Sequence, residues 1–214
     1  GQALAKQLGI HDDDMIAGLS RLTQKVHQSN GKIALQLAHA GVQTTLRESA
    51  DLPAWAPSAI HDPTFKKTPK AMSQREIKAV VAAFAQAAQR GKRAGFDAVQ
   101  IHAAHGYLVS QFLSPLKNVR TDIYGGSIEN RGRFLFQIYR AVRKAVGKDF
   151  PVLVKLNSKD FIRRGLTSKD ACFVATELDR MGIDAIEVSG GTPASGTLGP
   201  ARPNIDKADV EAYF

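Results

Sequence analysis

Residues 98–107 read AVQIHAAHGY, an apolar run that passes directly into two histidines and a tyrosine. The first five residues are typical of a short strand buried in a parallel sheet. A helix is expected before this strand, because Ser73 with Glu76 three residues later forms a capping-box signature. That helix is expected to end at Gly95. The segment therefore predicts a helix–strand unit with imidazole and phenol side chains at the carboxyl end of the strand.

The same unit recurs along the chain. Segments with apolar residues near the 3.6-residue period alternate with short apolar runs, and glycines separate most of them. Strands that alternate with helices predict parallel strands joined by right-handed crossovers. Helices are expected at about 12–27, 73–94, 129–146 and 167–181, strands at 32–37, 98–102, 152–156 and 185–189, long loops at 38–72 and 103–128, and one more helix beginning at Asp206.

The polar residues favour an incomplete (β/α)8 barrel over an open doubly wound sheet. A dinucleotide-binding sheet would show a glycine-rich turn after its first strand, and no G-x-G-x-x-G occurs. Barrels, in contrast, build active sites from the carboxyl ends of their strands. A full barrel takes about 250 residues, so we expect residues 1–214 to be part of one barrel domain, interrupted at Gly1 and again within a helix at Phe214. A polar side chain lies at or just past the end of each expected strand: Gln36, His102, Lys155 and Ser189.

The composition is that of an ordinary globular protein. Of the 214 residues, 43% are hydrophobic and 23% are charged, which excludes disordered and low-complexity classes. No apolar run approaches the roughly 18 residues of a membrane span, and no secretory signal is recognisable. The single cysteine, Cys172, excludes an intrachain disulfide and a cysteine-based zinc site. It also fits a reducing compartment, so a cytoplasmic protein is expected.

The formal charge of +9 is spread over short basic stretches such as 90–93 and 163–164. These stretches carry no interleaved aromatic residues of the kind that single-strand binders use. We therefore expect a solvated basic surface with no nucleic-acid or membrane partner. An oligomer is compatible with the sequence.

Two imidazoles and a phenol, from His102, His105 and Tyr107, leave the second expected strand within six residues. Imidazoles can donate hydrogen bonds to a developing oxyanion, and a nearby tyrosine can give up a proton in the same step. One histidine alone would be explained as a buried structural residue, but all three together favour a catalytic site. A metal site with His39 as third ligand is the weaker alternative, because closely spaced metal histidines usually lie on a helix.

Lys155, near the end of a buried strand, has three explanations of equal weight. A desolvated lysine could form a Schiff base, a fixed cation could face an electron-rich cofactor, and a strand-end lysine could extend to solvent. The glycine pairs at 125–126 and 190–191 could each bind a phosphate or shape the mouth of the barrel. Loop shaping is favoured for the first pair, and both alternatives stay open for the second.

Three blocks of sequence surround these residues. They are Gln36-Leu37-Ala38-His39-Ala40-Gly41, then His102-Ala103-Ala104-His105-Gly106-Tyr107-Leu108 with Gln111-Phe112-Leu113-Ser114-Pro115, then Asp122, Tyr124-Gly125-Gly126-Ser127, Asn130-Arg131 and Arg133-Phe134. Together they resemble the Old Yellow Enzyme family of FMN-dependent NADH:flavin oxidoreductases and ene-reductases. The similarity is to its bacterial branch, close to the barrel of 2,4-dienoyl-CoA reductases, and runs from about residue 12 to residue 189.

The resemblance implies a (β/α)8 barrel with FMN at its carboxyl face and NADH or NADPH as reductant. It also implies hydride transfer to the β-carbon of a small α,β-unsaturated carbonyl substrate of the enone type. By position, His102 and His105 would bind and polarise the substrate carbonyl oxygen, and Tyr107 would protonate the α-carbon. Gln36 would bind the pyrimidine edge of the flavin, and Lys155 would stand where the family usually has an arginine near flavin N1 and O2.

The chain departs from the family pattern at Val42, where relatives usually have an arginine. Longer relatives add an iron–sulfur segment after the barrel, and no cysteine cluster occurs here. An iron–sulfur cluster is therefore expected only in segments outside this chain. Two alternative functions stay open, a Schiff-base lyase that uses Lys155 and a non-catalytic barrel remnant.

Overall fold

The centre of the molecule is a parallel sheet of four strands in the order β1-β4-β5-β6. The computed structural model describes residues 1–45 and 53–200, so the helix expected at Asp206 lies outside the described residues. The four expected strands are confirmed, three of them with ends shifted by one or two residues. They are β1 (Ala34–Leu37), β4 (Ala98–Ala103), β5 (Val152–Asn157) and β6 (Ala185–Ser189).

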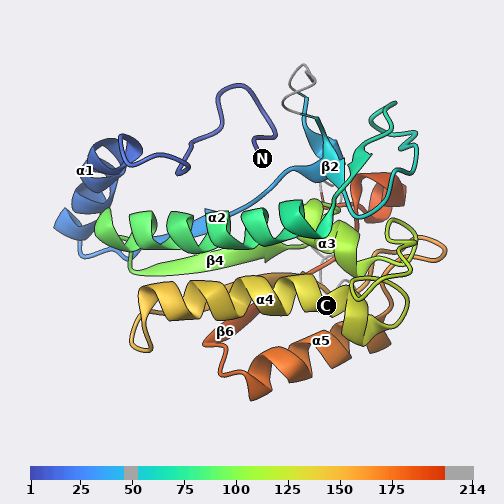
Figure 1. Cartoon of the computed structure of the whole chain (residues 1–214). Helices are drawn as coiled ribbons and strands as arrows, with labels where there is room; N and C mark the ends of the chain where they lie inside the picture. Colours follow the sequence, from blue (N-terminus) through green and yellow to red (C-terminus); the bar gives the residue numbers. More distant parts are fainter. Residues whose placement is uncertain (46–52, 201–214) are drawn as a thin grey trace.

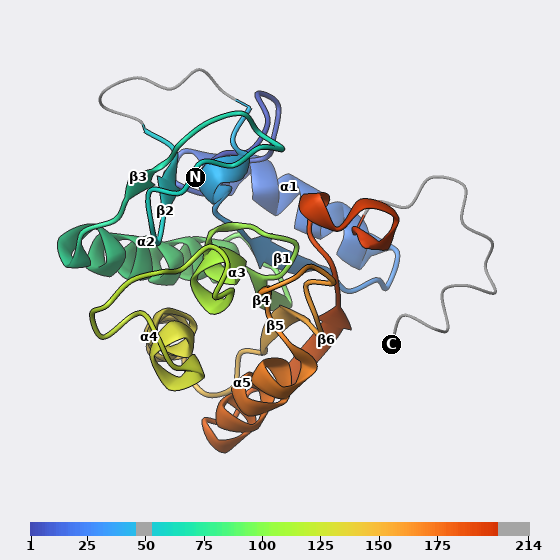
Figure 2. The same ribbon diagram turned by 90° about the vertical axis from the view of Figure 1, so that its right-hand side faces the viewer.

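Four long helices alternate with these strands, as the sequence predicts. They are α1 (Met15–Gln28), α2 (Gln74–Arg93), α4 (Ile128–Val146) and α5 (Ser168–Arg180). Helices α2, α4 and α5 lie side by side along the sheet (Figure 1), and in the view along the strands they cover one of its sides (Figure 2). This α/β arrangement with parallel strands is part of a (β/α)8 barrel.

The helix ends follow the predicted local signals. Ser73 accepts the Glu76 N–H, and the Glu76 carboxylate accepts the Ser73 N–H, so the predicted capping box begins α2. Thr167 and Asp170 form the same arrangement at the start of α5. Gly147 ends α4 with a φ of 85°, a left-handed conformation that favours glycine.

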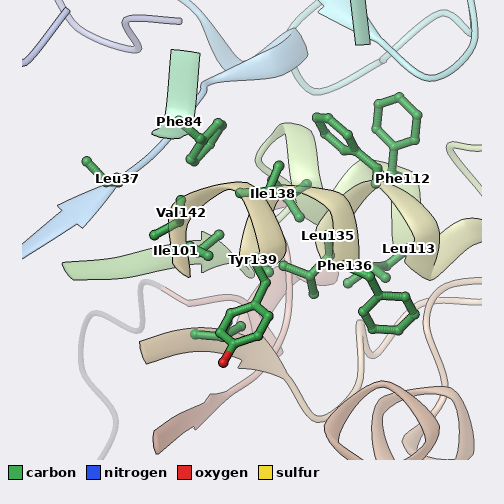
Figure 3. Close-up of a cluster of buried hydrophobic side chains, with 14 of the residues drawn as sticks. Leu37, Phe84, Ile101, Phe112, Leu113, Leu135, Phe136, Ile138, Tyr139 and Val142 are labelled. Carbon is green, nitrogen blue, oxygen red and sulfur yellow. The ribbon is translucent and has the colours of Figure 1, made fainter. Parts of the chain in front are cut away.

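The hydrophobic core lies between the sheet and helices α2 and α4 (Figure 3). The rings of Phe112 and Phe134 are 4.3 Å apart in its interior. Side chains from β1, β4, α2, the short helix α3 (Leu108–Leu113) and α4 meet in this layer: Leu37, Phe84, Ile101, Phe112, Leu113, Leu135, Phe136, Ile138, Tyr139 and Val142.

The burial expected for the strand at 98–102 is confirmed in β4, but it does not extend to β6. Five of the six residues of β4 are buried, whereas none of the five residues of β6 is. The side of the sheet opposite the helices carries exposed polar residues, among them Gln36 and Glu187. In a barrel this side faces the axis.

The two long loops contain short elements that the sequence did not predict. The loop at 38–72 includes a 3-10 helix, η1 (Gly41–Gln43), and a pair of two-residue strands, β2 (Trp55–Ala56) and β3 (Lys70–Ala71). The loop at 103–128 includes a short helix, α3 (Leu108–Leu113), and η2 (Pro193–Leu198) follows β6. All six residues of α3 are buried, so it has no exposed face and no amphipathic period to detect.

Within the described residues, no helix is both long and apolar enough to cross a membrane.

Candidate active site

The strand register brings the predicted polar residues to one end of the sheet. His102 of β4 is paired with Lys155 of β5, and Lys155 is paired with Glu187 of β6. Gln36 of β1 is paired with Gln100 of β4. Because the side chains of every second residue point to the same face of a strand, these rows lie on the side of the sheet that faces the barrel axis.

His102, His105 and Tyr107 form one cluster of rings. The ring of His102 meets His105 edge to face with a centroid distance of 5.1 Å, and it meets Tyr107 in the same way at 4.7 Å. His102 is 5% exposed, while the other two side chains are partly buried. The cluster thus places two imidazoles and a phenol where one small molecule could touch all three.

The backbone at His105 has an unusual conformation that several hydrogen bonds hold in place. Its φ is 60°, in the left-handed region that residues other than glycine seldom adopt. The His105 N–H donates to Asn157 Oδ1 at 3.1 Å, and the His105 carbonyl accepts from Gln43 Nε2 at 2.7 Å. The His105 side chain lies with Nε2 2.7 Å from the hydroxyl oxygen of Ser189. Ser189, singled out from the sequence as a strand-end polar residue, therefore contacts the cluster directly.

Both imidazoles are neutral at pH 7. Burial, together with repulsion from His105 once that ring is protonated and from the Lys155 ammonium, lowers the pKa of His102 to about 3. Burial and the Lys155 charge lower the pKa of His105 to about 4. The Nδ1 atom of His102 accepts the Ala104 N–H at 3.2 Å, so the single ring proton of His102 is on Nε2. His102 can therefore donate one hydrogen bond from Nε2 to a bound oxygen.

Tyr107 stands at the turn into α3, where it is the N-cap residue. Its backbone N–H donates to the carbonyl of Ala104, and its carbonyl accepts from the Gln111 N–H. These bonds fix the backbone on both sides of the tyrosine. Within the part of the chain that the structure describes, the Tyr107 hydroxyl makes no hydrogen bond and can serve a ligand.

A chain of polar contacts connects the cofactor candidates Gln36 and Lys155. Gln36 Nε2 donates to Gln100 Oε1 at 2.6 Å, and Gln100 Nε2 donates to Glu187 Oε2 at 2.8 Å. Lys155 Nζ donates to the other carboxylate oxygen, Glu187 Oε1, at 2.6 Å. Gln100 and Glu187 were not predicted as site residues, although the period of two along a strand places them on the same face as His102 and Ser189.

The Lys155–Glu187 ion pair distinguishes between the explanations given for this lysine. The Lys155 side chain is 20% exposed and faces the barrel axis, so it does not simply extend to solvent. Schiff-base formation needs a free amine nitrogen, whereas Lys155 Nζ donates to Glu187 Oε1 at 2.6 Å. The contacts of Lys155 therefore favour a fixed cation.

His39 does not join the histidine cluster. Its ring stacks on Trp55 with an interplanar angle of 6°, and its Nδ1 accepts the Gly41 N–H. Among residues 1–45 and 53–200, no group of three or more His, Cys, Asp or Glu side chains is placed to hold a metal ion. The geometry thus gives no support to the three-histidine metal site.

The glycine pair at 125–126 forms a tight turn before α4. A Cβ on Gly125 would lie 2.0 Å from the carbonyl oxygen of Arg120, so only glycine fits there. The carbonyl of Gly126 accepts a hydrogen bond from Arg131 Nη1 at 2.6 Å. These contacts favour the loop-shaping role of this pair over phosphate binding.

Comparison with known proteins identifies the family. The model of the NADH:flavin oxidoreductase / NADH oxidase family, an FMN family, matches residues 1–196. The chain belongs to this family. Its sequence is 44% identical over 191 residues to an NADPH dehydrogenase of Bacillus velezensis and 43% identical over 205 residues to one of a Geobacillus species. These matches cover 89% and 96% of this chain but 55% and 57% of the relatives, so the chain spans little more than half their length.

Solved structures of the Old Yellow Enzyme family share this fold. A morphinone reductase in complex with tetrahydroNAD superposes with a TM-score of 0.75 at 36% identity, over 84% of this chain and 55% of that one. Old Yellow Enzyme from Pichia sp. AKU4542 gives 0.76 at 30% identity, over 84% and 52%. A 2-naphthoyl-CoA reductase gives 0.82 at 30% identity, over 90% of this chain and 31% of that one. The resemblance stated from the sequence motifs is thereby confirmed, together with FMN and NAD(P)H as the family's cofactor and reductant.

The residues present fit FMN at its pyrimidine edge. That edge carries both hydrogen-bond donors and acceptors, which the amide of Gln36 can match. The ammonium of Lys155 supplies a positive charge of the kind that tunes a flavin near N1. Both groups lie on the axis-facing side of the sheet, connected through Gln100 and Glu187.

Proposed function

We propose that this chain is part of a single FMN-binding barrel domain of an oxidoreductase that reduces the C=C bond of α,β-unsaturated carbonyl compounds with NADH or NADPH. Membership of the FMN family supports the cofactor and the reductant. Relatives that are named as NADPH dehydrogenases and morphinone reductase support a small-molecule reductase.

One observation carries the proposal. Two neutral histidines converge at the carboxyl end of β4, beside a paired lysine, with a tyrosine whose hydroxyl has no hydrogen-bond partner among the described residues. Barrel enzymes place their catalytic groups at this end. A non-catalytic remnant would not need a left-handed histidine held by three neighbouring side chains.

The two histidines would bind the carbonyl oxygen of the substrate. His102 donates from Nε2, and His105 offers its ring next to the Ser189 hydroxyl. Because negative charge develops on this oxygen as hydride adds to the β-carbon, donors that are already in place stabilise the transition state. Neutral imidazoles suit this role, since His102 donates from Nε2 without adding charge, and His105 would donate from Nδ1 with its Nε2 accepting from the Ser189 hydroxyl.

Tyr107 would protonate the α-carbon of the substrate. Its ring contacts His102, so a substrate oxygen bound by the histidines would bring the adjacent carbons to the phenol. Gln36 and Lys155 would hold the pyrimidine edge of FMN, which supplies hydride when bound and reduced.

The experiment that tests the function is product analysis. The protein that carries this chain is incubated anaerobically with NADPH and 2-cyclohexen-1-one. Cyclohexanone should form in the same amount as NADPH is consumed. His102→Ala should lower kcat/KM for the enone by about 100-fold or more, as expected for loss of an oxyanion donor.

The control is His27→Ala, because His27 pairs with Asp97 at the surface, far from the cluster. It should leave kcat/KM unchanged. Formation of the allylic alcohol, or no turnover of any enone, would contradict the proposal.

A further inference from the structure

Glu187 occupies a bridging position that the roles above leave unexplained. One carboxylate oxygen accepts from Lys155 Nζ at 2.6 Å and the other from Gln100 Nε2 at 2.8 Å. The strand register places Glu187 directly opposite Lys155. The Glu187 carboxylate of β6 therefore holds a side chain from each of two other strands, Lys155 of β5 and Gln100 of β4.

The bridge fixes the orientation of the Gln36 amide. Because Gln100 gives its Nε2 to Glu187, its Oε1 faces Gln36 and accepts from Gln36 Nε2 at 2.6 Å. Gln36 then presents its carbonyl oxygen to a donor on a ligand and keeps the second hydrogen of its Nε2 for an acceptor. Without Glu187, the amide of Gln100 could rotate, and Gln36 could follow.

The bridge also offsets the charge of Lys155. The Lys155 ammonium lowers the pKa of Glu187 below its usual value, so the carboxylate is ionised at pH 7. The pair carries no net charge. A lysine held in this way stabilises negative charge on a neighbouring group less than a free ammonium would.

We propose that Glu187 is a positioning residue for FMN: it holds Lys155, orients Gln36 through Gln100, and so limits how strongly the site favours reduced over oxidised FMN. This inference rests on the proposed function. Lys155 is the group that acts on the cofactor, and Glu187 acts through it.

The test is the two-electron reduction potential of bound FMN, measured by anaerobic dye equilibration on the protein that carries this chain. Glu187→Gln keeps the shape of the side chain but releases the lysine. It should raise the preference for reduced FMN about tenfold, which corresponds to about 30 mV for a two-electron couple. Lys155→Met should shift the potential in the opposite direction.

A double-mutant cycle distinguishes action through Lys155 from a direct effect of charge. In the Lys155→Met background, the Glu187 carboxylate keeps Gln100 but loses the cation that it holds, so Glu187→Gln should shift the preference by less than about threefold. Glu177→Gln is the matched control, because Glu177 pairs with Arg180 on the surface of α5. It should leave the potential unchanged.

The outcomes separate the two claims. A wild-type protein that takes up no FMN would overturn the proposed function, and this inference with it. A flavin-loaded wild type whose potential does not respond to Glu187→Gln would overturn this inference alone. Equal shifts in both backgrounds would also overturn it, because Glu187 would then act by its charge and not through Lys155.

Discussion

His105 shows how a few contacts can hold one residue in a conformation that its own chemistry disfavours. A left-handed backbone costs a non-glycine residue on the order of 1–3 kcal/mol, and such residues cluster at functional sites. Here Asn157 and Gln43 bind the backbone of His105 on both sides. The cost is offset by contacts from β5 and from the loop after β1, which is why the ring points toward His102.

Tyr107→Phe removes a proton donor without removing the ring. We expect the oxidation of reduced enzyme by an enone to slow by about 100-fold or more, the range for loss of a general acid. Reduction by NADPH should change by less than about threefold, because no proton from Tyr107 is needed in that step. Stopped-flow absorbance measures both half-reactions separately. Equal slowing of the two would contradict the role of Tyr107 as proton donor.

The pKa values of His102 and His105 predict how stability depends on pH. In the unfolded chain a histidine titrates near 6.5, while in the folded chain the two pKa values are lowered to about 3 and about 4. Between these values the unfolded state binds more protons, so the free energy of unfolding falls as the pH drops from about 6.5 toward 4. Each histidine contributes up to about 1.4 kcal/mol per pH unit.

Urea unfolding at pH 7 and pH 5 measures this dependence. His102→Asn should make the loss of stability between the two pH values smaller, because one titrating group is gone. His11→Asn, at an exposed histidine, should leave it unchanged. A pH dependence that is the same in wild type and His102→Asn would contradict the neutral, buried state of this ring.

The capping box of α2 stabilises the fold through contacts that lie outside the candidate site. Ser73→Ala removes the acceptor for the Glu76 N–H and should lower the free energy of unfolding by about 1 kcal/mol. Ser29→Ala is the matched control, because Ser29 is exposed at the end of α1 and caps it through its backbone. Urea unfolding of both variants tests the difference, and equal losses would contradict the cap.

The long elements were predictable because local signals and burial agree in them. The box at Ser73 and the apolar run of β4 both follow from the sequence. Helix α3 was not predictable, since it is six residues long and buried on every side. The strands β2 and β3 have two residues each, too few for an alternating pattern.

Residues of the candidate site that lie at strand ends were easier to predict from the sequence than those that lie within strands. Gln36, His102, Lys155 and Ser189 could be chosen because they interrupt or end apolar runs. Glu187 could not be assigned to Lys155, because the pairing depends on the register of β5 and β6 and not on distance along the chain. Strand register is a property of the folded sheet.

For the whole molecule, the described residues form an arc of a barrel with two outer strands. Within these residues, β1 and β6 each pair with one neighbour. A groove of about 760 Å³ runs along β1, with Leu35 and Phe84 among its lining residues. Barrel closure pairs every strand edge, so this groove is where a closed barrel would continue.

The proposed function requires that the barrel holds FMN and passes hydride to an enone. The most direct test is the visible absorption spectrum of the natively purified protein that carries this chain, followed through an anaerobic titration. We predict an oxidised-flavin spectrum that bleaches with NADPH and returns when 2-cyclohexen-1-one is added. A colourless protein that also fails to take up added FMN would contradict the proposed function and the proposed roles of Gln36 and Lys155.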